Sequence, residues 1–397
     1  MDDPAPAVTE RRTIVAVGAV RGGVADVFDR VVSELSARGH RVRVIAVPAR
    51  RTPAWAGIRA ALSARSALRR AETVHLEFGS NDAEAFWFAL AAVLLRRDCV
   101  VVAHDYPELI HAPGAGLVPT SSRLATALAY RVLSPMLDRF LARILLRRAG
   151  VVVVFGEAAR DGWLGKGARR VEVIGHGGEP AGDGAPPPSR GDSVLFAGFL
   201  NRGKGIDTLL QAWALISERV ELPLVLAGEP NDPAWFRETM GRFGAIANPP
   251  RVLGPVAGER AFAALIGRAA VVVLPYRYSS PASGVLVRAL SAGRPVIATP
   301  MPAMRDAVRD GENGLLVPVD DPYALAAAIT RLCDSPAERD RLGAAAAETA
   351  RGMFSWSSHV DGVESAYRGA GGALSDGQCG AGSAGDEDPS ATRSART

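Results

Sequence analysis

The sequence predicts an α/β protein made of two doubly wound, Rossmann-like parallel-sheet domains that face a cleft. Short runs rich in Val and Ile alternate with helical patterns along most of the 397 residues, as expected of strands that helices bury on both faces. A stretch rich in Pro and Gly, residues 179–192, interrupts this alternation near the middle of the chain. We therefore predict a linker there, with a separate domain on each side.

The N-terminal domain is predicted to span residues 13–178, after a tail of residues 1–12. A helical pattern over residues 27–39 ends at Gly39, a residue type that often caps a helix. The apolar segment 85–95 is too short to span a bilayer and is expected to form a buried helix. Strand-like runs begin at residues 13, 42, 73, 99, 151 and 171.

The C-terminal domain is predicted to span residues 193–350. Its strand-like runs begin at residues 193, 222, 251, 271 and 294, and helical patterns cover residues 322–333 and 336–350. An amphipathic stretch, residues 351–369, follows. Residues 370–397 contain almost no large apolar side chain, so burial cannot offset the entropy of ordering them, and we predict a disordered tail.

Composition and charge restrict the partners of the chain. Basic residues outnumber acidic ones by 46 to 42, which suits an anionic substrate or membrane surface, and no nucleic-acid-binding motif is present. The three cysteines are far apart in sequence, which fits neither a disulfide framework nor a zinc site. The N-terminus has no apolar signal region. We expect a cytoplasmic protein, or one that is peripheral at the inner membrane face.

Three predicted strand-to-helix turns have features that favour an anion. Gly22 and Gly23 let the backbone approach a ligand where a helix begins, although such pairs are common in turns that bind nothing. In the second turn Lys204 stands between two glycines and is expected to point toward the cleft, with Arg202 nearby. Each of these two basic residues could equally be a solvated surface side chain.

The third turn begins a helix after the strand-like run at residue 271. Ser283 is a suitable N-cap, and the free amides of Ser283, Gly284 and Val285 are expected to face the cleft and attract an anion. Arg288 lies one turn into this helix, outside the cradle. It could reach a ligand from the side or be a solvated helical arginine.

The residues in these turns resemble those of the retaining family 4 glycosyltransferases, which have the GT-B fold. The similar segments are "LFAGFLNRGKGIDTLLQAW" and the block from "VVVLPYRYSSPASGVLVRAL" to "PYALAAAI". The resemblance implies a nucleotide-diphosphate sugar as donor, transfer with retention of configuration and no metal or other cofactor. It implies that Lys204 binds the diphosphate, and that residues 351–369 cross back to the N-terminal domain.

Three positions depart from the usual family pattern. Many members have two glutamates, where this chain has Ser280 and Arg288, and an arginine where it has Phe199. The chain is similar to a subgroup with a Ser-Gly step in place of the glutamate pair. The departures favour one alternative, a degenerate protein that binds a nucleotide or a partner without catalysis. A further alternative is a nucleotide-sugar epimerase on the same architecture.

Histidines and acids near predicted strand ends are the remaining site candidates. His104 follows a buried strand, and the resemblance suggests that it faces the transferred sugar. Asp105 and Glu77 are the nearest acids that could orient an acceptor. His75, in the middle of a strand, is expected to be a satisfied interior histidine.

The acceptor cannot be identified from the sequence; a small molecule, a glycan and a lipid-linked acceptor all remain open. The segment 133–150 is predicted to be a helix with arginines on one side and an apolar face on the other. Such a helix could dock on anionic lipid or, more commonly, bury its apolar face in the domain core. The predicted apolar face consists of Leu137, Phe140, Leu141, Ile144 and Leu145.

Overall fold

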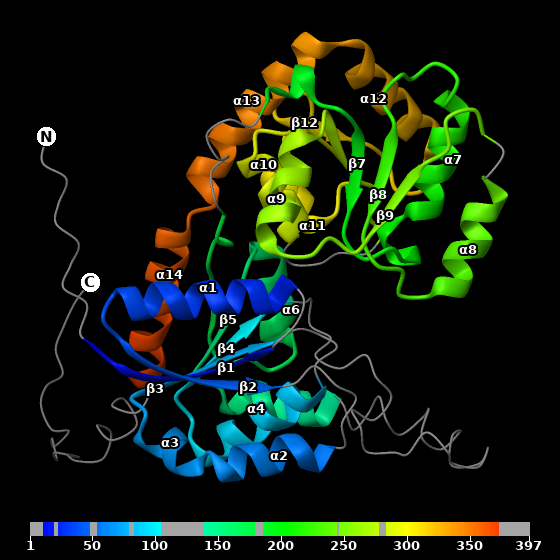
Figure 1. Cartoon of the computed structure of the whole chain (residues 1–397). Coiled ribbons are helices and arrows are strands. Elements are labelled where there is room, and N and C mark those ends of the chain that lie inside the picture. The colour runs from blue at the N-terminus through cyan, green and yellow to red at the C-terminus, as the bar shows by residue number, and fades with distance from the viewer. Residues whose placement is uncertain are drawn as a thin grey trace, which may run out of the picture.

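The chain folds around two six-stranded parallel sheets, each with helices on both sides (Figure 1). This computed structural model describes residues 11–19, 23–47, 54–78, 83–104, 139–178, 186–243, 246–277 and 283–372. The predicted pair of doubly wound α/β domains is confirmed.

The N-terminal sheet has the strand order β2-β1-β3-β4-β5-β6, and every neighbouring pair is parallel. Its direction of winding reverses between β1 and β3. The strands are β1 (Thr13–Ala19), β2 (Arg41–Val47), β3 (Thr73–Phe78), β4 (Cys99–Ala103), β5 (Val151–Val154) and β6 (Val171–Val173).

Both faces of this sheet are buried, which explains its continuous apolar strands. Along β4, Val101 packs into one core cluster, and its neighbours Val100 and Val102 pack into the other, because successive side chains of a strand point to opposite faces. Helices α1 (Gly23–Ala37) and α14 (Trp356–Gly372) cover one face. Helices α2 (Ala54–Ser63), α3 (Arg65–Arg70), α4 (Ala83–Leu95) and α6 (Glu157–Gly165) contribute side chains to the other core.

Two predictions about helices of this domain can be checked. The apolar segment 85–95 lies in the buried helix α4, as predicted. Residues 139–148 are helical, but the expected apolar face is wrong at Phe140, which is 59% exposed. The buried side is centred on Leu145 and Ala149, and at 3.6 residues per turn Phe140 falls on the opposite side of the helix from Ala149.

The C-terminal sheet has the order β12-β11-β10-β7-β8-β9, again with parallel pairs throughout. Its strands are β7 (Val194–Ala197), β8 (Leu224–Ala227), β9 (Arg251–Gly254), β10 (Val271–Leu274), β11 (Val296–Ala298) and β12 (Gly314–Leu316). The last of these was not predicted, because a three-residue strand that begins with glycine has too little pattern to be recognised.

The helices of the C-terminal domain follow its strands in regular alternation. They are α7 (Ile206–Ile216), α8 (Pro233–Arg242), α9 (Glu259–Arg268), α10 (Gly284–Ser291), α11 (Pro302–Ala307), α12 (Pro322–Asp334) and α13 (Pro336–Met353). The strand order places β7 and β10 side by side and sends the next connections in opposite directions. In open α/β sheets, ligands bind beyond the carboxyl ends of the strands at such a switch point.

The chain passes between the domains twice, and the two passages pack closely together. A Cβ at Gly177 would lie 2.3 Å from the Trp356 ring, and one at Gly175 would lie 2.7 Å from the Met353 carbonyl oxygen. After the second passage, α14 lies against the N-terminal sheet (Figure 1). This helix continues to Gly372, three residues into the segment that was expected to be a disordered tail.

Candidate functional site

The turns after β7 and β10 meet at the switch point of the C-terminal sheet. The first turn is a short 3₁₀ segment, η3 (Arg202–Lys204), followed by Gly205 at a φ of +67°. A Cβ at Gly205 would lie 1.9 Å from the carbonyl oxygen of Pro275, just after β10. The glycine therefore permits both the left-handed turn and its contact with the end of β10.

The Lys204 ammonium lies beside the beginning of α10. Its Nζ is 3.5 Å from the centre of the Tyr276 ring, and the Tyr276 hydroxyl is 3.5 Å from the Ser283 Oγ. Ser283 caps α10 as predicted, since its Oγ accepts a hydrogen bond of 3.3 Å from the Leu286 amide. No carboxylate among the described residues pairs with Lys204, so its charge is balanced only by contact with an aromatic ring.

The free end of α10 adds to this positive potential. Within the described ranges, the amides of Gly284 and Val285 donate to no acceptor. A helix start carries about half a positive charge on such amides. The structure thus brings together three groups that attract an anion: the Lys204 ammonium, the α10 amides and the Ser283 hydroxyl.

Arg277, which was not predicted as a site residue, holds the η3 turn in place. Its amide donates to the Gly203 carbonyl at 2.9 Å, and its guanidinium donates to the Arg202 carbonyl at 3.1 Å. The same guanidinium forms two hydrogen bonds with Asp207, of 2.7 and 2.9 Å. The contacts with the two carbonyl groups fix the backbone around Lys204, and the Asp207 carboxylate balances the charge of Arg277.

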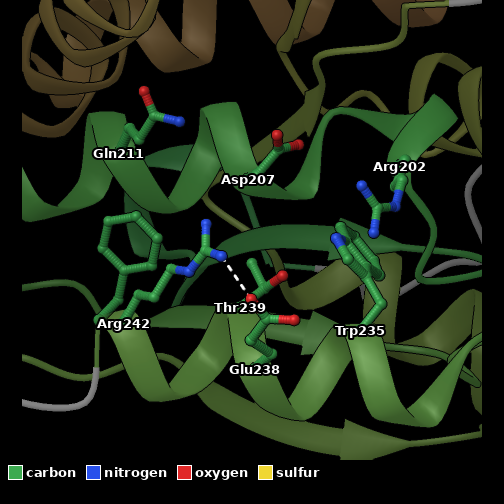
Figure 2. Close-up of a pocket in the computed structure, with 8 residues that line it drawn as sticks. Arg202, Asp207, Gln211, Trp235, Glu238, Thr239 and Arg242 are labelled. Atoms are coloured by element: carbon green, nitrogen blue, oxygen red, sulfur yellow. Dashed lines mark hydrogen bonds and ion pairs between the residues drawn. The ribbon is translucent and has the colours of Figure 1, made fainter.

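Arg202 points to a different place from Lys204. Its guanidinium lies 5.3 Å from the Trp235 ring centre and lines a pocket of about 160 Å³ between α7 and α8 (Figure 2). Lys204 and Ser283 do not line this pocket. Arg202 and Lys204 therefore lie on separate surfaces of the domain.

Arg288 folds back over the first turn of its own helix. It forms a two-point ion pair with Glu259 of α9, with both contacts at 2.7 Å, and donates to the Gly284 carbonyl at 3.1 Å. The arginine is therefore neither a freely solvated side chain nor an unpaired cation available to an anion. Since Glu259 begins α9 beyond the end of β9, the pair lies at the carboxyl-end side of the sheet.

The carboxyl ends of the two sheets face each other. Asp26, in the first turn of α1, lies close enough to Glu259 and Arg288 for both to influence its ionisation. Burial, then repulsion by Glu259, raises the pKa of Asp26. Similarly, burial and the charge of Glu157 in α6 raise the pKa of Asp306 in α11. The carboxyl ends of the strands of both domains therefore face one shared space. Across this space, α1 lies opposite α9 and α10.

His104 lies directly after β4, at the carboxyl end of the N-terminal sheet. Its Nε2 is 2.6 Å from Glu77 Oε1, and the side chain is 8% exposed. Glu77 is 1% exposed and binds a second histidine, His75, through its other oxygen at 3.0 Å. The suggestion that Glu77 could orient an acceptor stays a prediction, but the carboxylate is buried and each of its oxygens already lies within hydrogen-bond distance of a histidine. His75 is a satisfied interior histidine, as predicted.

Several predicted site residues lie outside the described residues, namely Gly22, Asp105 and Ser280. Gly23 is the first residue of α1. Sequence patterns missed Tyr276, Arg277, Glu259 and Asp26. A helix-first-turn acid such as Asp26 is too common to single out, and the other three acquire partners only through the strand order.

His176, in the first passage between the domains, makes stability sensitive to acid. Burial lowers the pKa of His176 to about 3, although its hydrogen bond to the Gly177 carbonyl opposes the shift. The unfolded chain therefore binds a proton below about pH 6.5 that the folded protein does not bind. The contribution of His176 to the free energy of unfolding is complete above about pH 6.5 and is lost as the pH falls toward 3.

We predict that His176→Asn reduces this acid sensitivity. The asparagine amide can donate to the Gly177 carbonyl but cannot be protonated. Between pH 7 and 5, wild type should lose about 2 kcal/mol more unfolding free energy than the variant, measured by urea titration at both pH values. An equal loss in the two proteins would show that His176 does not resist protonation.

The residues that the structure describes contain neither a metal-binding cluster nor a membrane-spanning helix. No group of three or more His, Cys, Asp or Glu side chains there is arranged to hold a metal ion. No helix there combines the length and apolar character that crossing a bilayer requires.

A family model described as "Glycosyl transferases group 1" matches residues 191–335, which include the η3 turn, Tyr276 and α10. The C-terminal domain is thus similar to group 1 glycosyltransferases. A D-inositol 3-phosphate glycosyltransferase of Thermobifida fusca is 33% identical over 184 residues, 44% of this chain and 42% of that protein. A phosphatidyl-myo-inositol mannosyltransferase of Mycobacterium leprae is 34% identical over 172 residues, 43% of this chain and 44% of that protein. The similarity thus spans about two fifths of these relatives' length.

Solved structures show that the whole fold is GT-B. Sucrose-phosphate synthase from Thermosynechococcus elongatus has a TM-score of 0.65 at 19% identity, covering 90% of this chain and 98% of that one. Anabaena HepE in complex with UDP and glucose has a TM-score of 0.66 at 16% identity, covering 89% and 99%. The segment that is similar to group 1 glycosyltransferases therefore lies in the C-terminal half of a two-domain GT-B fold.

Proposed function

We propose that this protein is a glycosyltransferase that moves a sugar from a nucleotide-diphosphate sugar to an acceptor. The observation that carries the proposal is the meeting of the Lys204 ammonium and the free α10 amides at a sheet switch point, within a domain similar to group 1 glycosyltransferases. Cleaving the bond to the sugar puts negative charge on the leaving diphosphate. Fixed donors aimed at that charge stabilise the transition state.

The proposal includes transfer with retention of configuration and without a metal ion, as the sequence resemblance implies. In this account the ammonium and amide groups neutralise the leaving diphosphate, and α1 of the N-terminal domain closes the opposite side of the site. The structure of HepE, which holds UDP and glucose, supports a nucleotide-sugar donor, and the similarity to D-inositol 3-phosphate glycosyltransferases supports transfer of a sugar. The acceptor remains a small molecule, a glycan or a lipid-linked molecule.

A second candidate is a degenerate protein that binds a nucleotide without transferring a sugar. The observations that favour it are the Arg288–Glu259 ion pair and Phe199, which is 55% exposed in the turn before η3. The paired Arg288 and the apolar ring of Phe199 occupy positions at which, by the resemblance, many family members have polar side chains that contact the sugar donor. Turnover assays separate this candidate from an enzyme.

The test uses a panel of nucleotides and nucleotide sugars. UDP, GDP, ADP and dTDP are first screened for a rise in melting temperature, since a ligand of the folded state stabilises it. Sugars carrying the selected base are then incubated with the protein in EDTA, and released nucleotide and free sugar are measured, with the anomeric configuration of any product read by NMR. We expect slow donor hydrolysis with retention. Binding with no release under any condition would instead support the degenerate protein.

A further inference from the structure

A buried chain of hydrogen bonds ends at His104. The Tyr367 hydroxyl of α14 lies 3.0 Å from His75 Nδ1, and His75 Nε2 lies 3.0 Å from Glu77 Oε2. The other carboxylate oxygen lies 2.6 Å from His104 Nε2. Three of the side chains are no more than 1% exposed, and His104 is 8% exposed.

The chemistry of the groups fixes the direction of this chain. Burial alone would raise the pKa of Glu77, but hydrogen bonds from His104 and His75 lower it to about 2. The carboxylate is therefore ionised at neutral pH and can only accept. Both histidines must then carry a hydrogen on Nε2. Since Glu77 is 1% exposed, it cannot exchange these donors for water.

The far end of the chain is fixed by Tyr367. Burial raises the pKa of this phenol well above its usual range, so it keeps its hydrogen. His75 Nδ1 is the acceptor for that hydrogen among the described residues. His75 therefore accepts at Nδ1 and donates at Nε2, and its Nε2–H fixes one oxygen of the Glu77 carboxylate.

His104 is then left with one free ring nitrogen. Its Nε2–H is directed at Glu77, so Nδ1 lies on the other edge of the ring, and none of the described residues forms a hydrogen bond with it. The ring packs against Phe155 at 4.7 Å between centres and lies 6.4 Å from His176. These neighbours restrict rotation of the ring, so Nδ1 has a defined position at the carboxyl end of β4.

We propose that Glu77, backed by His75 and Tyr367, is a positioning residue that keeps a hydrogen on His104 Nε2 and so leaves Nδ1 for the substrate. Nδ1 then serves as a hydrogen-bond acceptor for a hydroxyl group of the bound sugar. This inference rests on the proposed glycosyltransferase function. Glu77 does not contact the substrate. Its hydrogen bond to Nε2 determines which ring nitrogen of His104 keeps a lone pair.

The key variant is Glu77→Gln, which keeps the shape of the side chain and removes its charge. The amide can accept from one histidine, and its NH₂ group must face the other, so the His104 tautomer is no longer dictated. Tyr367→Phe is a milder variant that removes one hydroxyl and keeps the edge-on ring contact with His75, whose centres are 5.9 Å apart. Tyr367→Phe keeps the proposal testable if the Glu77→Gln protein does not fold.

The first readout needs no activity. NMR of the full chain labelled with ¹⁵N-histidine, with His104 assigned by its own substitution, reports which ring nitrogen carries hydrogen at neutral pH. We expect Nε2–H alone at His104 in wild type and a mixture of tautomers in Glu77→Gln. In Tyr367→Phe, His75 keeps its Nε2–H toward Glu77 and should gain a population with a hydrogen on Nδ1 as well, because no phenol donates to that nitrogen, while His104 is unchanged.

The second readout is donor turnover. We expect Glu77→Gln to lower kcat by at least about tenfold while nucleoside diphosphate affinity stays within about twofold, because the diphosphate contacts lie in the other domain. A wild-type His104 protonated at Nδ1 when neutral, or a Glu77→Gln protein with unchanged tautomer and turnover, would overturn the inference. Absence of turnover in wild type is instead a failure of the proposed function, and the NMR result still decides the geometry.

Discussion

Replacing Lys204 by alanine should reduce kcat/KM for the nucleotide-sugar donor by roughly 100- to 1,000-fold. The ammonium carries a full positive charge beside the α10 amides, and removal of one fixed donor from developing negative charge typically costs about 3–4 kcal/mol. Because α10 and Ser283 remain, the residual activity should exceed the uncatalysed rate. The measurement is steady-state donor hydrolysis or transfer at saturating acceptor.

The chain offers a matched control for this experiment. Only two of its 46 basic residues are lysines, Lys166 and Lys204. Lys166 follows α6 in the N-terminal domain and is exposed, so Lys166→Ala should leave kcat/KM within about twofold. Lys204→Arg should recover only part of the activity, since a planar guanidinium does not reproduce a compact ammonium above Tyr276. Equal kinetics for Lys204→Ala and wild type would contradict the assigned role.

Substitution of Gly205 by alanine should damage both stability and donor binding. The residue has a left-handed backbone, which costs a non-glycine residue roughly 1–2 kcal/mol. The added Cβ would also stand 1.9 Å from the Pro275 carbonyl oxygen, so the η3 turn or the end of β10 must move. We expect a loss of at least about 2 kcal/mol in unfolding free energy and donor affinity at least about tenfold weaker.

Gly241→Ala is the control for Gly205→Ala. Gly241 lies within α8, and a Cβ there would meet nothing within 4 Å. This change should be neutral or stabilise the protein by up to about 1 kcal/mol. If Gly205→Ala were as harmless as Gly241→Ala in urea unfolding and donor binding, the η3 turn would not depend on its contact with β10.

The sequence predicted the architecture well because the features that define it are local. Continuous Val and Ile runs identify strands buried on both faces, and Ser283 was recognised as an N-cap from its position before an amphipathic pattern. The errors also have local causes. Strand β12 has only three residues and begins with glycine, and Phe140 belongs to a helix whose apolar residues extend around more than one face.

The sequence predicted some residues of the site but not the contacts between them. Lys204 and the start of α10 were found because each combines glycine, a strand end and a helix start within a few residues. Their connections were not found, because they join residues far apart in the chain. Tyr276 meets Lys204, Glu259 meets Arg288, and Tyr367 reaches His75 across 292 residues. Such pairs exist only once the strand order has brought their elements together.

The central claim is that an ammonium and a helix start bind a diphosphate without help from a metal ion. Calorimetric titration of the wild-type protein with UDP, GDP, ADP and dTDP in EDTA tests it most directly, with each diphosphate compared with its monophosphate. One diphosphate should bind, at least about tenfold more tightly than its monophosphate, and added Mg²⁺ should not strengthen it. Binding of no diphosphate, or binding that appears only with Mg²⁺, would contradict the account.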